Sequence, residues 1–221
     1  MRGLPHDPLK DLAPVSHLVD VHQMVLVHPS VRATDMAGLV AAAKAAPGTL
    51  NFGSYGTASQ PHLLFGALMA ATGIEMVHVP YRGLTPAVLA TIAGEVQMTL
   101  AGVASARTHI EAGTLRALAV GRPTRLPQLP AVPTLVEAGF PQIDPRTWFG
   151  VLAPAATPSA LRARIAADIR TAMAAPAVAE RHLTPNGYTV HAGTPDAFAA
   201  FIAADFDYKA GLIQAAGITA A

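Results

Sequence analysis

The chain has 221 residues, which is enough for one large domain or two small ones with buried cores. Hydrophobic residues make up 52% and charged residues 13%, a balance that is typical of a globular protein and excludes a disordered one. The net charge is +1 without any basic run, so we expect no nucleic-acid partner, and the lack of cysteine excludes disulfides, thiolate catalysis and cysteine-based zinc sites.

Between residues 24 and 122, apolar runs that suit strands alternate with segments that suit helices. The predicted strands, in chain order, are 24–28, 50–53, 76–79, 96–100 and 115–120. The predicted helices between them are 34–46, 59–71, 86–93 and 104–112, with Thr34 and Thr85 as N-caps. Strands joined through helices need crossover connections, so these five strands and four helices predict a complete doubly wound domain with a mostly parallel sheet.

A proline-rich segment follows, with six prolines between residues 123 and 145, and it is expected to run over the surface. Inside this segment, Thr134 and Glu137 have the spacing of a capping box, and Gly139 would end the short helical turn that they begin. The segment therefore predicts a connection rather than a domain of its own.

The remaining residues predict three helices but few strands. The predicted strands are 148–152 and 188–191, and the predicted helices begin at Thr157, near Ala177 and at Thr194. The last helix is expected to bury its apolar side chains, which are Phe198, Phe201, Ile202 and Phe206. Two short strands do not make a stable sheet, and a crossing strand around Val15 to Val19 adds only one more. We therefore predict a complete lobe at 24–146 and a partial lobe made of 1–23 and 147–221.

The loop Gly53–Ser59 joins a predicted strand to a predicted helix at the carboxyl edge of the sheet, where ligands bind in open α/β sheets. Its small residues expose backbone N–H groups, and the helix that follows adds positive potential, so the loop is suited to hold an anion. An ordinary tight turn is the alternative interpretation. His62, in the first turn of that helix, would donate to a ligand as a neutral imidazole or would simply pack.

A second loop with the same arrangement lies between the strand 76–79 and the helix 86–93. Tyr81 would offer a hydroxyl and an aromatic wall, and Arg82 a fixed positive charge for a carboxylate, unless the tyrosine packs and the arginine is solvated. Trp148 would pack in a core or line a cleft. Two loops that suit an anion, on one sheet edge, make binding more credible than either loop alone.

The signatures of catalysis are incomplete. The loop Gly53–Ser59 fits neither the Gly-x-Ser-x-Gly elbow nor the Gly-x-Gly-x-x-Gly fingerprint, and the chain has no Gly-Lys-Ser/Thr phosphate loop. The nine histidines, including His17, His22 and His28, are dispersed without the spacing of metal ligands, and the few carboxylates are far apart. We therefore expect neither a metal nor another cofactor, and we predict that the chain is not an enzyme.

Seven runs of sequence resemble the Bug family of solute receptors, the substrate-binding components of tripartite tricarboxylate transporters. The runs are 4–16, 25–29, 51–54, 78–83, 110–120, 132–139 and 148–154, in the family's order. The resemblance implies a periplasmic binding protein-like fold of type II, with two lobes that close on a small organic carboxylate in the periplasm and deliver it to the membrane components of the transporter. It also implies ligand-binding residues, which are Ser54, Tyr55, Gly56, Thr57, Ser59, His62, Tyr81, Arg82 and Gly83.

The chain departs from this family in two places. Members usually begin with a signal peptide, a first strand and a loop rich in proline and glycine that grips the ligand, whereas residues 1–8 have no apolar core. Members also often have Asp or Asn where this chain has Ala101, which is a candidate ligand-binding residue. The alanine makes an amino-acid ligand less expected. If the absent loop supplied half of a micromolar affinity of about −8 kcal/mol, the chain alone would bind at about millimolar concentration. A cytosolic small-molecule-sensing domain, a nucleotide-dependent enzyme and an inactive receptor fragment are the alternatives.

Overall fold

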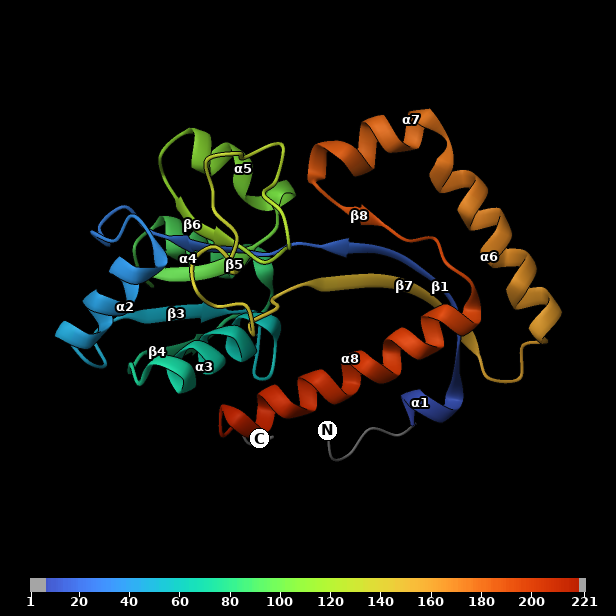
Figure 1. Cartoon of the computed structure of the whole chain (residues 1–221), viewed down its shortest axis with the longest axis horizontal. Coiled ribbons are helices and arrows are strands. Elements are labelled where there is room, and N and C mark those ends of the chain that lie inside the picture. Colours follow the sequence, from blue (N-terminus) through green and yellow to red (C-terminus); the bar gives the residue numbers. More distant parts are fainter. Residues whose placement is uncertain (1–6, 219–221) are drawn as a thin grey trace. The chain divides into compact units, whose positions relative to one another are not determined.

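A computed structural model describes residues 7–218, and these divide into two compact units. Among the described residues, unit 1 contains 7–21 and 147–210, and unit 2 contains 22–146 and 211–218 (Figure 1). The prediction that residues 1–8 have no apolar core concerns residues that lie mostly outside the described range. Among those that are described, no helix has the length and apolar character to cross a membrane.

Unit 2 is built on a five-stranded sheet. Its strands are β2 (Met24–Val27), β3 (Asn51–Ser54), β4 (Val77–Pro80), β5 (Met98–Ala101) and β6 (Arg116–Val120), in the spatial order β4-β3-β5-β2-β6. Strand β3 pairs in parallel with β4 and β5, whereas β2 pairs antiparallel with both β5 and β6. Four strands therefore share one direction, and β2 alone runs against them.

The direction of β2 corrects the expectation that each helix between two strands makes a crossover. Val27, at the end of β2, pairs with the first residues of β5 and β6. The chain then passes through α2 (Met36–Ala45) and starts β3 from that same edge. A helix between two strands makes a crossover connection only when the chain passes to the opposite edge of the sheet. Here the chain returns to the edge at which β2 ended.

The four predicted helices of unit 2 are present, with two corrected beginnings. They are α2, α3 (Gln60–Thr72), α4 (Leu84–Ile92) and α5 (Val103–Glu111). The cap of α2 is Asp35 rather than Thr34, because its carboxylate accepts a hydrogen bond from the Gly38 N–H at 2.7 Å. The N-cap of α4 is Gly83 rather than Thr85. Its φ of 128° is open only to glycine, and it starts the helix early enough to place Thr85 inside the first turn.

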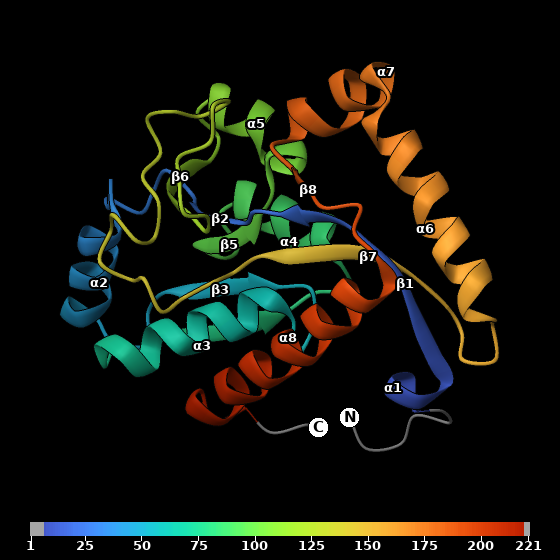
Figure 2. The same cartoon turned by 45° about the vertical axis from the view of Figure 1, so that its right-hand side comes forward.

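The central strands β2 and β5 of the unit 2 sheet are buried on both faces. Val25 and Val27 of β2 belong to a core cluster with residues of α2 and α3, and Met24 and Leu26 belong to a second cluster with residues of α4 and α5. Alternate residues of a strand point to opposite faces, so each face receives two of these side chains. Figure 2 shows α3 and α5 on opposite sides of the sheet, as in a doubly wound fold.

The proline-rich connection contains the predicted capping box. The Glu137 N–H donates to the Thr134 hydroxyl at 3.0 Å, and the Thr134 N–H donates to the Glu137 carboxylate at 2.7 Å. Gly139 ends this turn with a φ of 89°. The capping box is therefore confirmed. It fixes a turn that places Leu135 and Ile143 in the core of unit 2.

Unit 1 contains an antiparallel sheet in the order β7-β1-β8. Its strands are β1 (Leu12–Val21), β7 (Thr147–Pro154) and β8 (Thr189–Val190). Its helices are α1 (Pro8–Asp11), α6 (Ser159–Ala174), α7 (Pro176–Val178) and the part of α8 (Pro195–Ala215) up to Ala210. A π-helical turn and a 3-10 turn, at 179–183 and 184–186, lead from α7 toward β8. The strand predicted around Val15 to Val19 is confirmed and is longer than expected.

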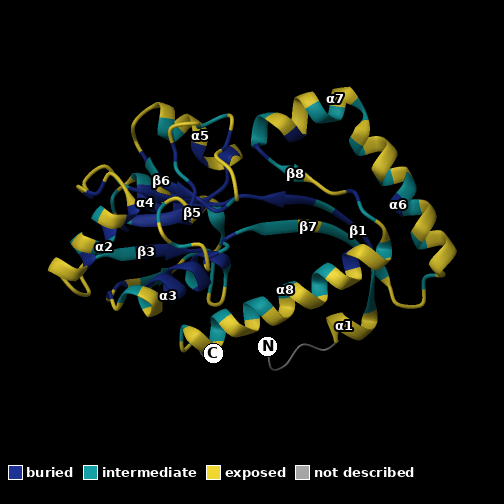
Figure 3. Cartoon of the chain, in the orientation of Figure 1, coloured by how far each residue is buried: buried dark blue, intermediate teal, exposed yellow. Residues whose placement is uncertain are grey.

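The predicted burial of α8 is only partly correct. Phe198 is fully buried and Phe201 is half-buried, but 57% of Phe206 is exposed. Leu161 on α6 is exposed as well. Figure 3 shows yellow, exposed segments along both helices. Three strands, one of them only two residues long, offer too little sheet to cover helices of 16 and 21 residues.

Candidate functional site

The carboxyl ends of β3, β4, β5 and β6 meet at one edge of the unit 2 sheet, because these strands share a direction. Helices α3, α4 and α5 begin at this edge, each just after a strand. Their N-cap residues are Ser59, Gly83 and Gly102, and in the described part of the chain none of these three caps its helix through a side chain. The first N–H groups of three helices thus face one edge without side-chain acceptors from their N-caps.

The loop between β3 and α3 is held in shape by its own serines. The Ser54 hydroxyl lies 3.0 Å from the Gly56 carbonyl oxygen, and the Gly56 N–H donates to Ser54 Oγ at 3.2 Å. The Ser59 hydroxyl donates to the same carbonyl at 2.6 Å. Ala58 has a φ of 59°, which is uncommon for a residue with a side chain. Both predicted serines therefore position the loop, while Thr57 is exposed at its tip.

Two stacked histidines support this loop. The rings of His62 and His78 have centroids 3.8 Å apart, and His78 Nε2 lies 2.6 Å from Ser54 Oγ. The Ala58 N–H donates to His62 Nδ1 at 3.2 Å, so a neutral His62 carries its proton on Nε2 and can donate from there. Burial and the neighbouring His62 lower the pKa of His78 to about 4, and burial also lowers the pKa of His62. Both rings are thus neutral at neutral pH.

The second predicted loop is tied to the first. The Tyr81 N–H donates to the Ser54 carbonyl oxygen at 2.8 Å, and the Tyr81 ring packs beside Gly53, where an added Cβ would lie 3.3 Å from it. Burial raises the pKa of the Tyr81 hydroxyl, so this group stays protonated. Arg82 is exposed beside Gly83 at the start of α4. The structure thus brings Ser54 to His62 and Tyr81 to Gly83 together at the sheet edge.

Two predicted residues lie apart from these loops. Ala101, at the end of β5, is fully buried in the core, and a ligand-binding role for it stays a prediction. Trp148 belongs to unit 1, where its indole N–H donates to Asp205 Oδ2 at 2.8 Å and its ring packs edge-on against Phe198 and Phe201. A ligand-binding role for Trp148 stays a prediction.

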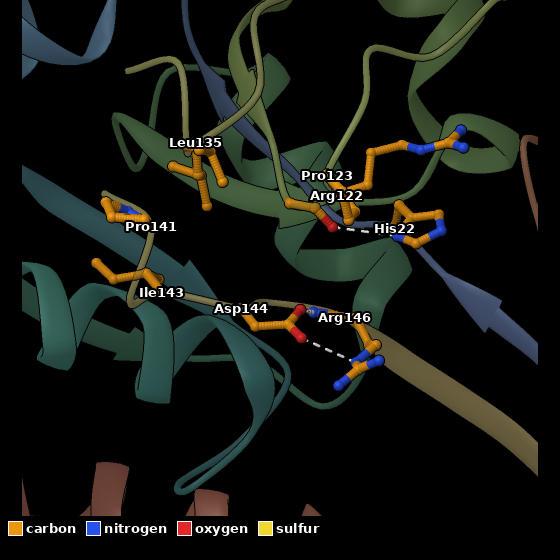
Figure 4. Close-up of a pocket in the computed structure, with 10 residues that line it drawn as sticks. His22, Arg122, Pro123, Leu135, Pro141, Ile143, Asp144 and Arg146 are labelled. Carbon is orange, nitrogen blue, oxygen red and sulfur yellow. Dashed lines mark hydrogen bonds and ion pairs between the residues drawn. The ribbon is translucent and has the colours of Figure 1, made fainter. Parts of the chain in front are cut away.

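A cavity of about 190 Å³ at the same edge of unit 2 was not predicted from the sequence. Figure 4 shows Leu135, Pro141 and Ile143 on one side of it, and the hydrogen bond of His22 to Gly121 with the ion pair of Asp144 and Arg146 on the other. The Gln60 amide, in the first turn of α3, donates to the Asp144 carbonyl oxygen at 3.2 Å, so the cavity adjoins the start of that helix. The signal in the sequence was two arginines, Arg122 and Arg146, at the ends of the proline-rich segment.

Known proteins resemble this chain over most of its length. The family model for the tripartite tricarboxylate transporter family receptor, TctC, matches residues 1–218. A UPF0065 protein in the tcbD-tcbE intergenic region of Pseudomonas sp. strain P51 is 39% identical over 197 residues, which are 89% of this chain and 58% of that protein. Protein BugT of Bordetella pertussis is 33% identical over 98% of this chain and 66% of its own length. The chain therefore spans about two thirds or less of these relatives.

Solved structures have the same fold. A structure described as a periplasmic transporter superposes with a TM-score of 0.91 at 33% identity, covering 99% of this chain and 72% of that one. The structure of R. palustris Rpa4515 with adipate has a TM-score of 0.91 at 28% identity, covering 99% of this chain and 73% of that one. These likenesses confirm the predicted periplasmic binding protein-like α/β class.

Proposed function

Because the chain belongs to the tripartite tricarboxylate transporter receptor family, we propose that it binds a small organic carboxylate for uptake by a transporter of that kind and catalyses no reaction. One observation carries this proposal: α3, α4 and α5 begin at one sheet edge, and no N-cap side chain among the described residues occupies their first N–H groups. An anion satisfies such groups, and a carboxylate has two oxygens to do so.

The helix ends supply part of the binding energy. Each N-terminus favours an anion by about 0.3–1 kcal/mol, so three acting together contribute about 1–3 kcal/mol. The exposed Arg82 guanidinium adds a fixed charge whose planar donors match a carboxylate. The backbone N–H of Thr57, with the Nε2–H of His62, completes the proposed set of donors, while Gly56 helps to form the turn. Ser54 and Ser59 act by holding the loop in shape.

A dicarboxylate is the ligand class that we propose first. The 28% identical protein whose structure contains adipate supports this choice. We also propose a periplasmic location and membrane partners of the transporter, as the resemblance implies, with unit 2 as the complete lobe and unit 1 as the partial one. The proposed location and partners are those of a whole receptor, whereas this chain matches 58% and 66% of the lengths of the two relatives named above.

The test is a thermal-shift screen followed by calorimetry, with mono-, di- and tricarboxylates titrated to about 10 mM, since single-lobe affinities are expected near 1 mM. Arg82→Ala should weaken binding by about 10-fold, because it removes a charged hydrogen-bond donor. Arg32→Ala is the matched control. Arg32 is an exposed arginine of the same unit, in the loop after β2, whose end lies at the opposite sheet edge.

Three outcomes decide the proposal. Saturable binding of one acid class that Arg82→Ala weakens and Arg32→Ala leaves unchanged supports it. Equal loss in both variants would mean that only overall charge attracts the acid, and the proposed site would be wrong. If no acid shifts the melting temperature of a chain that melts cooperatively, and calorimetry is also silent, the loops do not bind carboxylates.

A further inference from the structure

Unit 1 contains a cluster of side chains that the proposed receptor function does not use. His17 Nε2 lies 3.0 Å from Asp20 Oδ1, and His191 Nε2 lies 2.9 Å from Asp20 Oδ2. The two imidazole rings stack, with centroids 4.1 Å apart and planes 15° apart. Among the described residues, these three form a group whose nitrogen and oxygen ligand atoms all lie within 4.8 Å of one another.

A β-bulge in β1 creates this cluster. His17 pairs with Gly150 and Val19 pairs with Phe149, so Leu18 is an extra residue in β1. In a regular strand, residues three apart point to opposite faces, but the extra residue turns His17 and Asp20 to the same face. The spacing of the two residues in the sequence therefore conceals their proximity.

The third member arrives through β8. The His191 N–H donates to the Leu18 carbonyl oxygen at 2.9 Å, and Asp20 pairs with Thr189 across the strands. Both contacts fix the backbone of His191 beside the bulge. The cluster thus joins residues more than 170 positions apart in the chain. It lies beside β8, a strand of two residues that has few other contacts to hold it in place.

His17 is the member whose environment points to a ligand. The residue is 4% exposed, and its Nε2 makes no hydrogen bond within the described part of the chain, although a carboxylate oxygen lies 3.0 Å away. A buried ring nitrogen without a hydrogen bond is costly unless something else engages it.

We propose that His17, Asp20 and His191 bind one divalent transition-metal ion of the Zn²⁺ class, which ties β8 to β1. Two imidazoles and one carboxylate are ligands that Zn²⁺, Co²⁺ and Ni²⁺ accept, whereas Ca²⁺ and Mg²⁺ prefer sites made only of oxygen. Ligand atoms about 2.0–2.1 Å from Zn²⁺ in a tetrahedron lie about 3.4 Å apart. The present separations of 2.9 and 3.0 Å require only a small expansion.

The stacked rings must splay so that both lone pairs converge on the ion. His17 is held by its burial, but 37% of the His191 side chain is exposed. His191 is therefore the ligand that turns, and its exposed side is the path by which the ion enters. A fourth position, filled by water, remains on that side, as in many zinc sites with three protein ligands.

The only tryptophan of the chain is a built-in reporter for this site. The centroid of the Trp148 ring lies 6.1 Å from that of His17. Co²⁺ and Ni²⁺ have open d shells and quench indole fluorescence at short range, whereas Zn²⁺ has a filled shell and does not. We expect Co²⁺ to quench Trp148 with a stoichiometry of one, Zn²⁺ to reverse the quenching by competition, and Mg²⁺ to have no effect.

Substitutions separate this site from adventitious binding. His191→Ala should weaken Co²⁺ binding by at least about 100-fold, because it removes one of three ligands. His182→Ala is the matched control, since His182 is an exposed histidine of the same unit. Asp20→Asn, which keeps the shape of the side chain, should weaken binding as well, and circular dichroism checks that each variant is folded.

Saturating Zn²⁺, at about 100 times its Kd, should also raise the melting temperature by roughly 5–10 °C in the wild-type chain and not in His191→Ala. Absence of quenching by Co²⁺ in the folded wild type would overturn the proposal. Quenching that persists unchanged in His191→Ala, or that disappears in His182→Ala, would assign the ion to other residues and overturn it too. The proposal stands apart from carboxylate binding, because it uses residues of unit 1 alone and metal ions as the only probe.

Discussion

Acidification should destabilise unit 2 through His78, and the size of the effect follows from the contacts of this residue. The pKa of His78 is lowered from its ordinary value of 6.5 to about 4 by burial and by the stacked His62. In the unfolded chain the ring regains its ordinary pKa, so the unfolded state binds more protons between about pH 6.5 and pH 4. The free energy of unfolding is therefore highest above this window and falls as the pH drops through it.

The pKa difference corresponds to about 3 kcal/mol for a fully shielded ring. His78 is only half-buried, and screening by solvent reduces the expected loss to about 1–2 kcal/mol. His62 adds to the loss in the same direction, because burial lowers its pKa too. The protonated His78 would also disturb Ser54, whose hydroxyl lies 2.6 Å from Nε2 and shapes the loop after β3.

Urea unfolding at about pH 7 and about pH 5 measures this loss. Far-UV circular dichroism follows the whole chain, whereas Trp148 fluorescence follows unit 1, so a comparison of the two isolates unit 2. His78→Gln should remove most of the difference between the two pH values. His109→Gln, at a partly exposed position on α5 of the same unit, should leave it unchanged. If His78→Gln retained the full pH dependence of the wild type, the assignment to His78 would be wrong.

Two further substitutions test the packing and the caps. Gly150→Ala should lower the free energy of unfolding by about 1–3 kcal/mol, because a Cβ on β7 would collide with the buried ring of Phe198. In a denaturation experiment, the double variant with Phe198→Leu should recover part of this loss. Asp35→Ala should cost about 1 kcal/mol, because the Asp35 carboxylate caps α2, while Thr34→Ala should change the free energy of unfolding by less than about 0.5 kcal/mol. Equal effects of the last two variants would restore Thr34 as the cap.

The periodicity of the sequence determined most of unit 2. Its five strands and four helices, and the capping box of Thr134 and Glu137, were predictable because each depends on residues close together in the chain. The resemblance of seven runs to one receptor family pointed to the fold class, and similar solved structures confirm that class. The two loops at the sheet edge were also predictable, because strand–loop–helix junctions have a local signature.

Other features depend on contacts between distant segments, and only the tertiary structure decided them. The direction of β2 depends on which edge the chain reaches after α2, and the exposure of Phe206 depends on how much sheet is there to cover it. The role of Ser54 in shaping its loop depends on its contact with His78, which lies on the next strand, β4.

The cluster of His17, Asp20 and His191 was the least predictable feature. No spacing in the sequence suggests it, because a bulge turns two of its members to one face and a strand pairing brings the third from the other end of the chain. Local patterns predict elements because hydrogen bonds within an element are set by near neighbours. Sites assembled from several elements depend on register and packing, which the folded chain alone determines.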